Sequence, residues 1–152
     1  PLVDFMHKIN LYGSLPGLVL THIIYGIPIT TLTFRNYYAS IPNELVEAAK
    51  IDGADLMSIY WNILLPISIP SFVVVLIWQF TQAWNDFLFS VVLTSSKNWT
   101  VTVALNNMAG SQIVAWNIQM AASLIAALPT LLVYILLGKY FLRGMMAGSL
   151  KG

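Results

Sequence analysis

Three long stretches of this chain carry almost no charge, and they limit what the chain can fold into. Leu15 to Phe34 has no charged side chain over about 20 residues, enough helix to cross roughly 30 Å of hydrocarbon. Ile67 to Thr94 holds one charge, Asp86, and Gln112 to Gly138 holds none. We therefore predict an all-α polytopic membrane protein with about three spans. The predicted spans cover about residues 15–34, 67–85 and 116–140, with a re-entrant or interfacial segment after the second.

The composition agrees with a membrane protein and excludes several other classes. Hydrophobic residues make up 58% of the chain and charged residues 9%, against about 25% charged in a soluble domain. Those fractions exclude a soluble globular domain and a disordered tail. The sequence contains 0 cysteines, which excludes a disulfide scaffold and a thiolate metal site. A net charge of +1 provides no basic surface for nucleic acid.

Motifs that would support chemistry are missing from the sequence. No G-x-x-x-x-G-K-[ST] motif occurs, so we expect no ATP bound by a P-loop. His7 and His22 lie alone, without the spacing of metal ligands, and no arrangement of Ser, His and Asp indicates a nucleophile. We predict no enzyme activity, no bound cofactor and no metal. A process that needs energy would have to draw it from a partner.

The basic residues predict how the chain is oriented. With three spans, Lys8 and Lys97 fall on the side of the N-terminus. The other side carries five basic residues, namely Arg35, Lys50, Lys139, Arg143 and Lys151. The positive-inside rule places that side in the cytoplasm, together with the C-terminus and the loop between the first two spans. The chain begins at Pro1 and shows no signal peptide, so we expect it to be the C-terminal part of a longer protein.

The loop over about residues 35–66 holds four of the six acidic residues. Pro42 suits the first turn of a helix that we predict from about Pro42 to Ile51. Gly53 permits the left-handed turn that ends this helix. Asp55 is expected to cap a second helix that runs to Leu65, before Pro66. The loop is thus predicted to form a helical hairpin at the cytoplasmic surface.

Glu47-Ala48-Ala49 opens a spaced pattern that continues with Gly53 after three residues and with Ile63, Leu65 and Pro66 after nine more. This pattern resembles the EAA loop of ATP-binding cassette (ABC) importer permeases. The resemblance implies a type I permease fold and a coupling helix that sits in a cleft of a cytoplasmic ATPase. The residues it implies for ATPase coupling are Glu44, Glu47, Ala48, Ala49, Asp52, Gly53, Ile63, Leu65 and Pro66. The rival interpretation is an amphipathic interfacial helix whose Glu47 only faces water.

Further short motifs resemble the carbohydrate-type permeases, in particular the second membrane subunit of maltose-type systems. They are Trp84-Asn85-Asp86-Phe87, Leu128-Pro129, Arg143-Gly144, Ala147-Gly148 and Lys151-Gly152. The resemblance implies that residues 1–152 are the C-terminal part of one transmembrane domain that imports a sugar across the cell membrane. The partners it implies are a cytoplasmic ABC ATPase dimer, a second and different permease subunit, an extracytoplasmic solute-binding protein and the lipid bilayer.

The second predicted span carries a polar stripe. Ser71, Gln79, Gln82 and Asp86 fall within about 80° of one another at 100° per residue. Such a stripe is expected to face protein or water rather than lipid. The candidates for the substrate pathway are Gln79, Gln82, Trp84, Asn85 and Asp86. The alternative is that these side chains hold neighbouring helices together.

Three alternative functions remain open on the sequence. The chain could belong to a non-ABC channel or secondary transporter driven by an ion gradient. It could be an ABC importer permease for a solute other than a sugar. It could also be a membrane scaffold whose polar stripe only holds a neighbouring helix.

Overall fold

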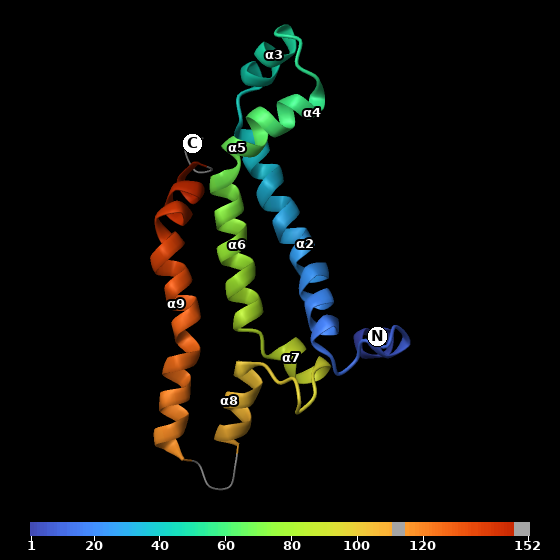
Figure 1. The fold of residues 1–152 in the computed structure, drawn as a ribbon, viewed down its shortest axis with the longest axis vertical. Helices are drawn as coiled ribbons and strands as arrows, with labels where there is room; N and C mark the ends of the chain where they lie inside the picture. The colour runs from blue at the N-terminus through green and yellow to red at the C-terminus, as the bar shows by residue number, and fades with distance from the viewer. Residues whose placement is uncertain (111–114, 148–152) are drawn as a thin grey trace. The chain divides into compact units, whose positions relative to one another are not determined.

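The computed structural model describes residues 1–110 and 115–147, and every regular element in that part of the chain is helical. Figure 1 shows the three longest helices, which are α2 (Leu15–Ser40), α6 (Ile69–Trp84) and α9 (Trp116–Ala147). The described chain divides into two compact units, each of which takes part of these three helices. Unit 1 joins Pro1–Ile27 with Phe80–Leu132, and unit 2 joins Pro28–Gln79 with the described residues from Val133 on.

Two helices are long and apolar enough to cross a membrane, namely α2 and α9 as far as Tyr140. α2 begins at the predicted Leu15 and α9 at the predicted Trp116, but both extend beyond their predicted ends. We predicted that the first span ends before Arg35, because charged residues usually lie outside the hydrocarbon. A charge does not end the helix, since arginine is a good helix former. Between Trp116 and Tyr140 the hydrophobic side chains of α9 are mostly exposed, as expected where lipid is the solvent.

The second predicted span, about residues 67–85, corresponds to α6, which forms a bent pair with the second helical segment of the hairpin. Within this pair, the first segment contains α4 (Leu56–Ile59), a π-helix (Tyr60–Leu64) and α5 (Leu65–Ile67), and the second is α6. The two segments meet at 64°, and only together do they pass as a third candidate span. Our prediction that the helix stops before Pro66 was wrong. Proline clashes with the carbonyl four residues earlier in a regular helix, and the wider π-turn before Pro66 accommodates its ring.

Unit 1 contains three short helices that the sequence did not predict. They are α1 (Leu2–Lys8), α7 (Leu88–Leu93) and α8 (Val101–Ala109). The backbone N–H of Gly13 donates to the Leu93 carbonyl at 3.0 Å, and the Asn98 side chain donates to the Gly13 carbonyl at 3.2 Å. α7 occupies the stretch expected to be re-entrant or interfacial. These contacts join the N-terminal turn to the loop after α7.

Unit 2 contains the helical hairpin and the halves of α2 and α6 that lead to it. Its hairpin begins after α2, continues through α3 (Asn43–Ile51) and ends at the bend before α6. The rings of Phe34 in α2 and Phe72 in α6 meet edge to face, with centroids 4.6 Å apart. Further along α6, the Gln79 amide donates to the Thr30 hydroxyl at 3.0 Å. Direct side-chain contacts therefore join α2 and α6, the two helices that lead into and out of the hairpin.

Candidate functional site

The hairpin, residues 41–67, is the first candidate site. Pro42 lies at the N-cap of α3, one residue before the helix begins, and Glu44 is in the first turn. A carboxylate there interacts favourably with the positive end of the helix dipole, and Lys50 in the last turn does so with the negative end. The predicted helix from about Pro42 to Ile51 is confirmed to within one residue.

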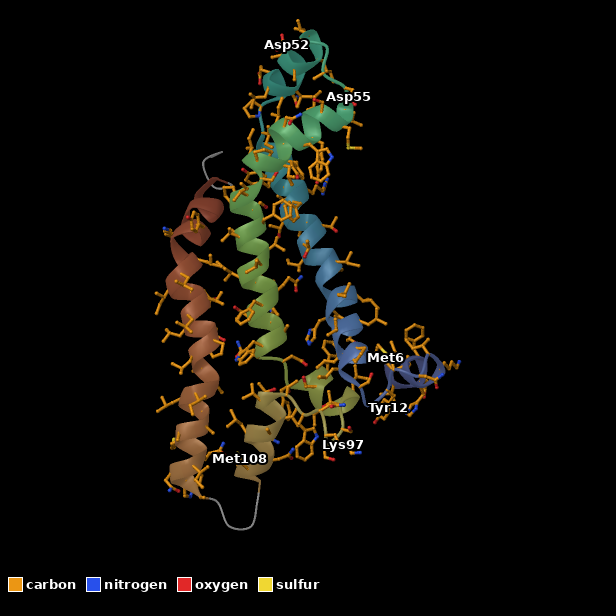
Figure 2. The ribbon with its side chains drawn as sticks, in the orientation of Figure 1. Met6, Tyr12, Asp52, Asp55, Lys97 and Met108 are labelled. Atoms are coloured by element: carbon orange, nitrogen blue, oxygen red, sulfur yellow. The ribbon has the colours of Figure 1, made fainter. Side chains whose placement is uncertain are left out.

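The turn between α3 and α4 has the geometry that its sequence predicts. Gly53 has a φ of +82°, its N–H donates to the Lys50 carbonyl at 3.1 Å, and the Ala54 N–H donates to the Ala49 carbonyl at 2.9 Å. These two bonds form a Schellman motif. Asp55 then accepts a hydrogen bond from the Ser58 N–H at 3.2 Å and caps α4. Figure 2 shows Asp52 and Asp55 at this turn.

The hairpin presents an acidic and apolar surface. Four carboxylates and one lysine give residues 41–67 a net charge of −3. None of these carboxylates makes an ion pair with a described residue. Glu47 and Ala48 are exposed, and so are two large apolar residues beside the turn, Ile51 at 86% and Leu56 at 79%. Exposed apolar groups of this size, ringed by charge, are typical of a protein interaction surface.

The spaced motif divides between that surface and the interior of the hairpin. Ala49 is 7% exposed, and Ile63 and Leu65 are half-buried, so these three residues support the hairpin rather than present a contact. The sequence analysis gave no coupling role to the exposed apolar residues of the hairpin. The sequence does contain a signal for this surface, because apolar residues flank a glycine turn in an otherwise polar loop. The exposed apolar residues are Ile51, Leu56, Met57 and Trp61.

The pathway candidates of α6 are already engaged within the chain, apart from the exposed Gln82. Gln79 bonds Thr30, as described above for unit 2. In unit 1 the indole N–H of Trp84 donates to the carbonyl of Ala126 in α9 at 2.9 Å. Asn85 is exposed, and its amide donates to the Thr81 carbonyl one turn back at 3.0 Å. Gln79 and Trp84 thus bond neighbouring helices, whereas Asn85 bonds the preceding turn of its own helix.

Asp86 lies just after the end of α6 and holds the start of α7. Its carboxylate accepts from the N–H of Phe89 at 3.1 Å, and from the N–H and hydroxyl of Ser90 at 2.9 and 2.7 Å. Nε2 of His22, in α2, lies 3.5 Å from the same carboxylate, whose side chain is 9% exposed. Sequence reasoning missed His22 and Ser90 as its partners, because these contacts depend on the tertiary fold.

The described residues of unit 2 form an apolar pocket too small for a sugar. It lies between α2 and α6 and holds about 100 Å³, whereas ligand pockets usually hold about 300 Å³ or more. Its lining is Ile29, Thr30, Thr33, Val74, Val75 and Trp78. No group of three or more potential metal ligands occurs among the described residues. Of the tail motifs, Gly148, Lys151 and Gly152 lie outside the described residues.

Comparison with known proteins decides what kind of chain carries these features. Residues 2–146 match the family described as the binding-protein-dependent transport system inner membrane component. The chain belongs to this family. The predicted family and the all-α permease fold are thereby confirmed. This result makes the hairpin part of a permease rather than of an isolated membrane helix pair.

The relatives of this permease include sugar transporters. It is 58% identical to a probable ABC transporter permease protein of Pyrococcus horikoshii over 100% of this chain and 56% of that protein. It is 46% identical to the xylose/arabinose import permease protein of Haloferax volcanii over 88% of this chain and 45% of that one. It is 34% identical to the glucose import system permease protein of Saccharolobus solfataricus over 100% and 54%. The chain thus spans about half the length of these relatives.

Replacing Asp86 with alanine in this permease is expected to reduce stability. The variant leaves the N–H groups of Phe89 and Ser90 without their acceptor, at a cost of about 1 to 3 kcal/mol. Thermal unfolding of the full-length protein in detergent measures the loss. Asn85→Ala is the matched control, because it removes one exposed amide that bonds only its own helix. Equal melting temperatures for the two variants would contradict the capping role.

Proposed function

We propose that this chain is part of the membrane-spanning permease subunit of an ATP-driven importer that carries a sugar. The exposed acidic hairpin with the complete EAA spacing is the observation that carries the proposal. Family membership and the names of the sugar-importing relatives support it. The hairpin faces the cytoplasm, on the side where five of the seven basic residues lie.

The hairpin couples ATP hydrolysis to movement of the helices. Its net charge of −3 fits a basic cleft on an ATPase, where Glu47 pairs with a basic group. Ala48 lets the partner backbone approach closely, and Ile51 and Leu56 bury apolar area on docking. Closure of two ATPase subunits pulls the hairpin inward, and rigid movement of the spans turns the pathway from inward-facing to outward-facing.

The substrate pathway is completed by other chains. The Gln79 and Trp84 side chains of α6 are bonded within this chain, and the pocket beside α6 is small, so a second permease subunit supplies the other wall. An extracytoplasmic binding protein delivers the solute. The ATPase supplies the nucleotide site, and this chain needs no cofactor of its own.

Transport assays on the full-length permease test this proposal. The protein is purified with its companion subunits, reconstituted in proteoliposomes and supplied with labelled xylose, arabinose or glucose. We expect uptake that requires ATP and the binding protein and persists when ion gradients are collapsed. Uptake driven by an ion gradient without ATP would identify a secondary transporter. ATP-driven uptake of a non-sugar solute alone would contradict the sugar assignment.

A further inference from the structure

One side chain connects the two ends of the hairpin. The hydroxyl of Tyr37, one turn before the end of α2, donates a hydrogen bond to the carbonyl of Ile67, the last residue of α5. Tyr37 precedes the hairpin and Ile67 ends it. This bond therefore fixes the base of the hairpin, although the two residues are 30 positions apart.

The backbone at the base is a weak point without this bond. The chain bends by 64° between α5 and α6, at Ser68. Pro70 has no N–H to donate to the carbonyl of Pro66, so the regular i→i−4 hydrogen bond is missing at the bend, and the Pro66 carbonyl accepts a cap N–H instead. The N–H of Ser68 bonds Leu64 and Leu65, both on the hairpin side. Carbonyls at the end of a helix lack intrahelical partners, and Tyr37 supplies a donor to one of them from another helix.

Tyr37 is the outermost of three residues on α2 that hold neighbouring helices in unit 2, two of them holding α6 and Tyr37 holding α5. Thr30, Phe34 and Tyr37 follow one another at spacings of four and three and so share one face of α2. Phe34 and Thr30 hold Phe72 and Gln79, both within α6. Of the three links, the Tyr37 bond is the one that reaches past the bend to the hairpin.

We propose that Tyr37 is a positioning residue that locks the hairpin to α2, so that a pull on the hairpin moves α2 and α6 together. This inference rests on the proposed coupling function. With the lock in place, force applied to α3 or α4 reaches both helices as one rigid lever. Without this hydrogen bond, the hairpin rotates about Ser68. Part of the movement of the ATPase then bends the chain at Ser68 instead of moving α2.

Tyr37→Phe tests the lock, because it removes the hydroxyl and keeps the ring. ATP hydrolysis and solute uptake are measured in the same proteoliposomes containing the full transporter. We expect the uptake per ATP hydrolysed to fall about five-fold, the factor that corresponds to one net hydrogen bond. Tyr38→Phe is the matched control. The Tyr38 hydroxyl makes no hydrogen bond to a described residue, so this variant is expected to keep the ratio of the unchanged protein.

The ratio separates coupling from a merely structural effect, which would lower hydrolysis and uptake together. An unchanged ratio in Tyr37→Phe, or an equal fall in Tyr38→Phe, would overturn the lock. If Tyr37→Phe assembles poorly, the ratio is taken on the assembled fraction. Tyr37→Cys with Ile67→Cys, joined by a bifunctional reagent, is then expected to restore it, whereas Phe34→Cys with Phe72→Cys links α2 to α6 alone and is not. Uptake by the unchanged protein that needs no ATP would instead overturn the proposed function itself.

Discussion

Replacing Glu47 with lysine is expected to abolish ATP-driven uptake while the permease still folds and inserts. Glu47 is exposed and makes no ion pair with a described residue, so the folded chain does not depend on it. If Glu47 pairs with a basic group of the ATPase as proposed, the variant removes one member of a buried charge pair, which costs about 2 to 5 kcal/mol, or roughly thirty-fold or more in affinity. Retention of the ATPase during purification and ATP-driven uptake both measure the loss.

Lys97→Glu is the control for charge reversal. Lys97 is exposed, lies in unit 1 outside the hairpin and makes no ion pair with a described residue. This variant is expected to retain the ATPase at the level of the unchanged protein. A Glu47→Lys permease that keeps both its ATPase and its uptake would show that the hairpin carries no coupling contact.

Replacing Gly53 with valine is expected to uncouple the transporter through the backbone alone. A left-handed φ of +82° costs an L-residue about 1 to 2 kcal/mol, and a β-branched side chain fits it worse. A Cβ at this position would meet nothing within 4 Å, so no steric clash contributes. The strain opposes the two hydrogen bonds of the Schellman motif and changes the angle between α3 and α4. We expect uptake to fall about ten-fold or more, measured as the initial rate.

Gly13→Val is the matched control for the backbone cost. Gly13 has a φ of +72°, and a Cβ there would also meet nothing within 4 Å. Its turn belongs to unit 1 and not to the hairpin. Both variants are therefore expected to lose similar thermal stability, but only Gly53→Val to lose uptake per assembled transporter. If both variants lose uptake to the same extent, Gly53 contributes to folding and not to coupling.

Sequence reasoning succeeded where the signal is local. Long uncharged runs located α2 and α9, because hydrocarbon excludes charge, although both runs extend upstream of the helices. The turn of the hairpin followed from single residues, since Gly53 alone permits the left-handed backbone and Asp55 supplies an acceptor for the next helix. These features depend on neighbours within a few positions of the chain.

The failures concern contacts between distant residues and backbone irregularity. The periodicity of α6 predicted a polar stripe, but it did not reveal that Gln79 is held by Thr30 or that Asp86 caps α7 beside His22. Pro66 was expected to end a helix, and a π-turn accommodated it instead. The bond from Tyr37 to the carbonyl of Ile67 has no sequence signal, because any residue supplies a carbonyl.

The position of Ile51 in the assembled transporter tests the central claim most directly. Its side chain is 86% exposed at the end of α3, and a photoreactive amino acid placed there reports what the hairpin touches. Irradiation of the full transporter in membranes is predicted to yield a covalent product with the P-loop ATPase. A product with lipid alone, or labelling of a cysteine at this position by an impermeant reagent added to the outer face, would contradict the account.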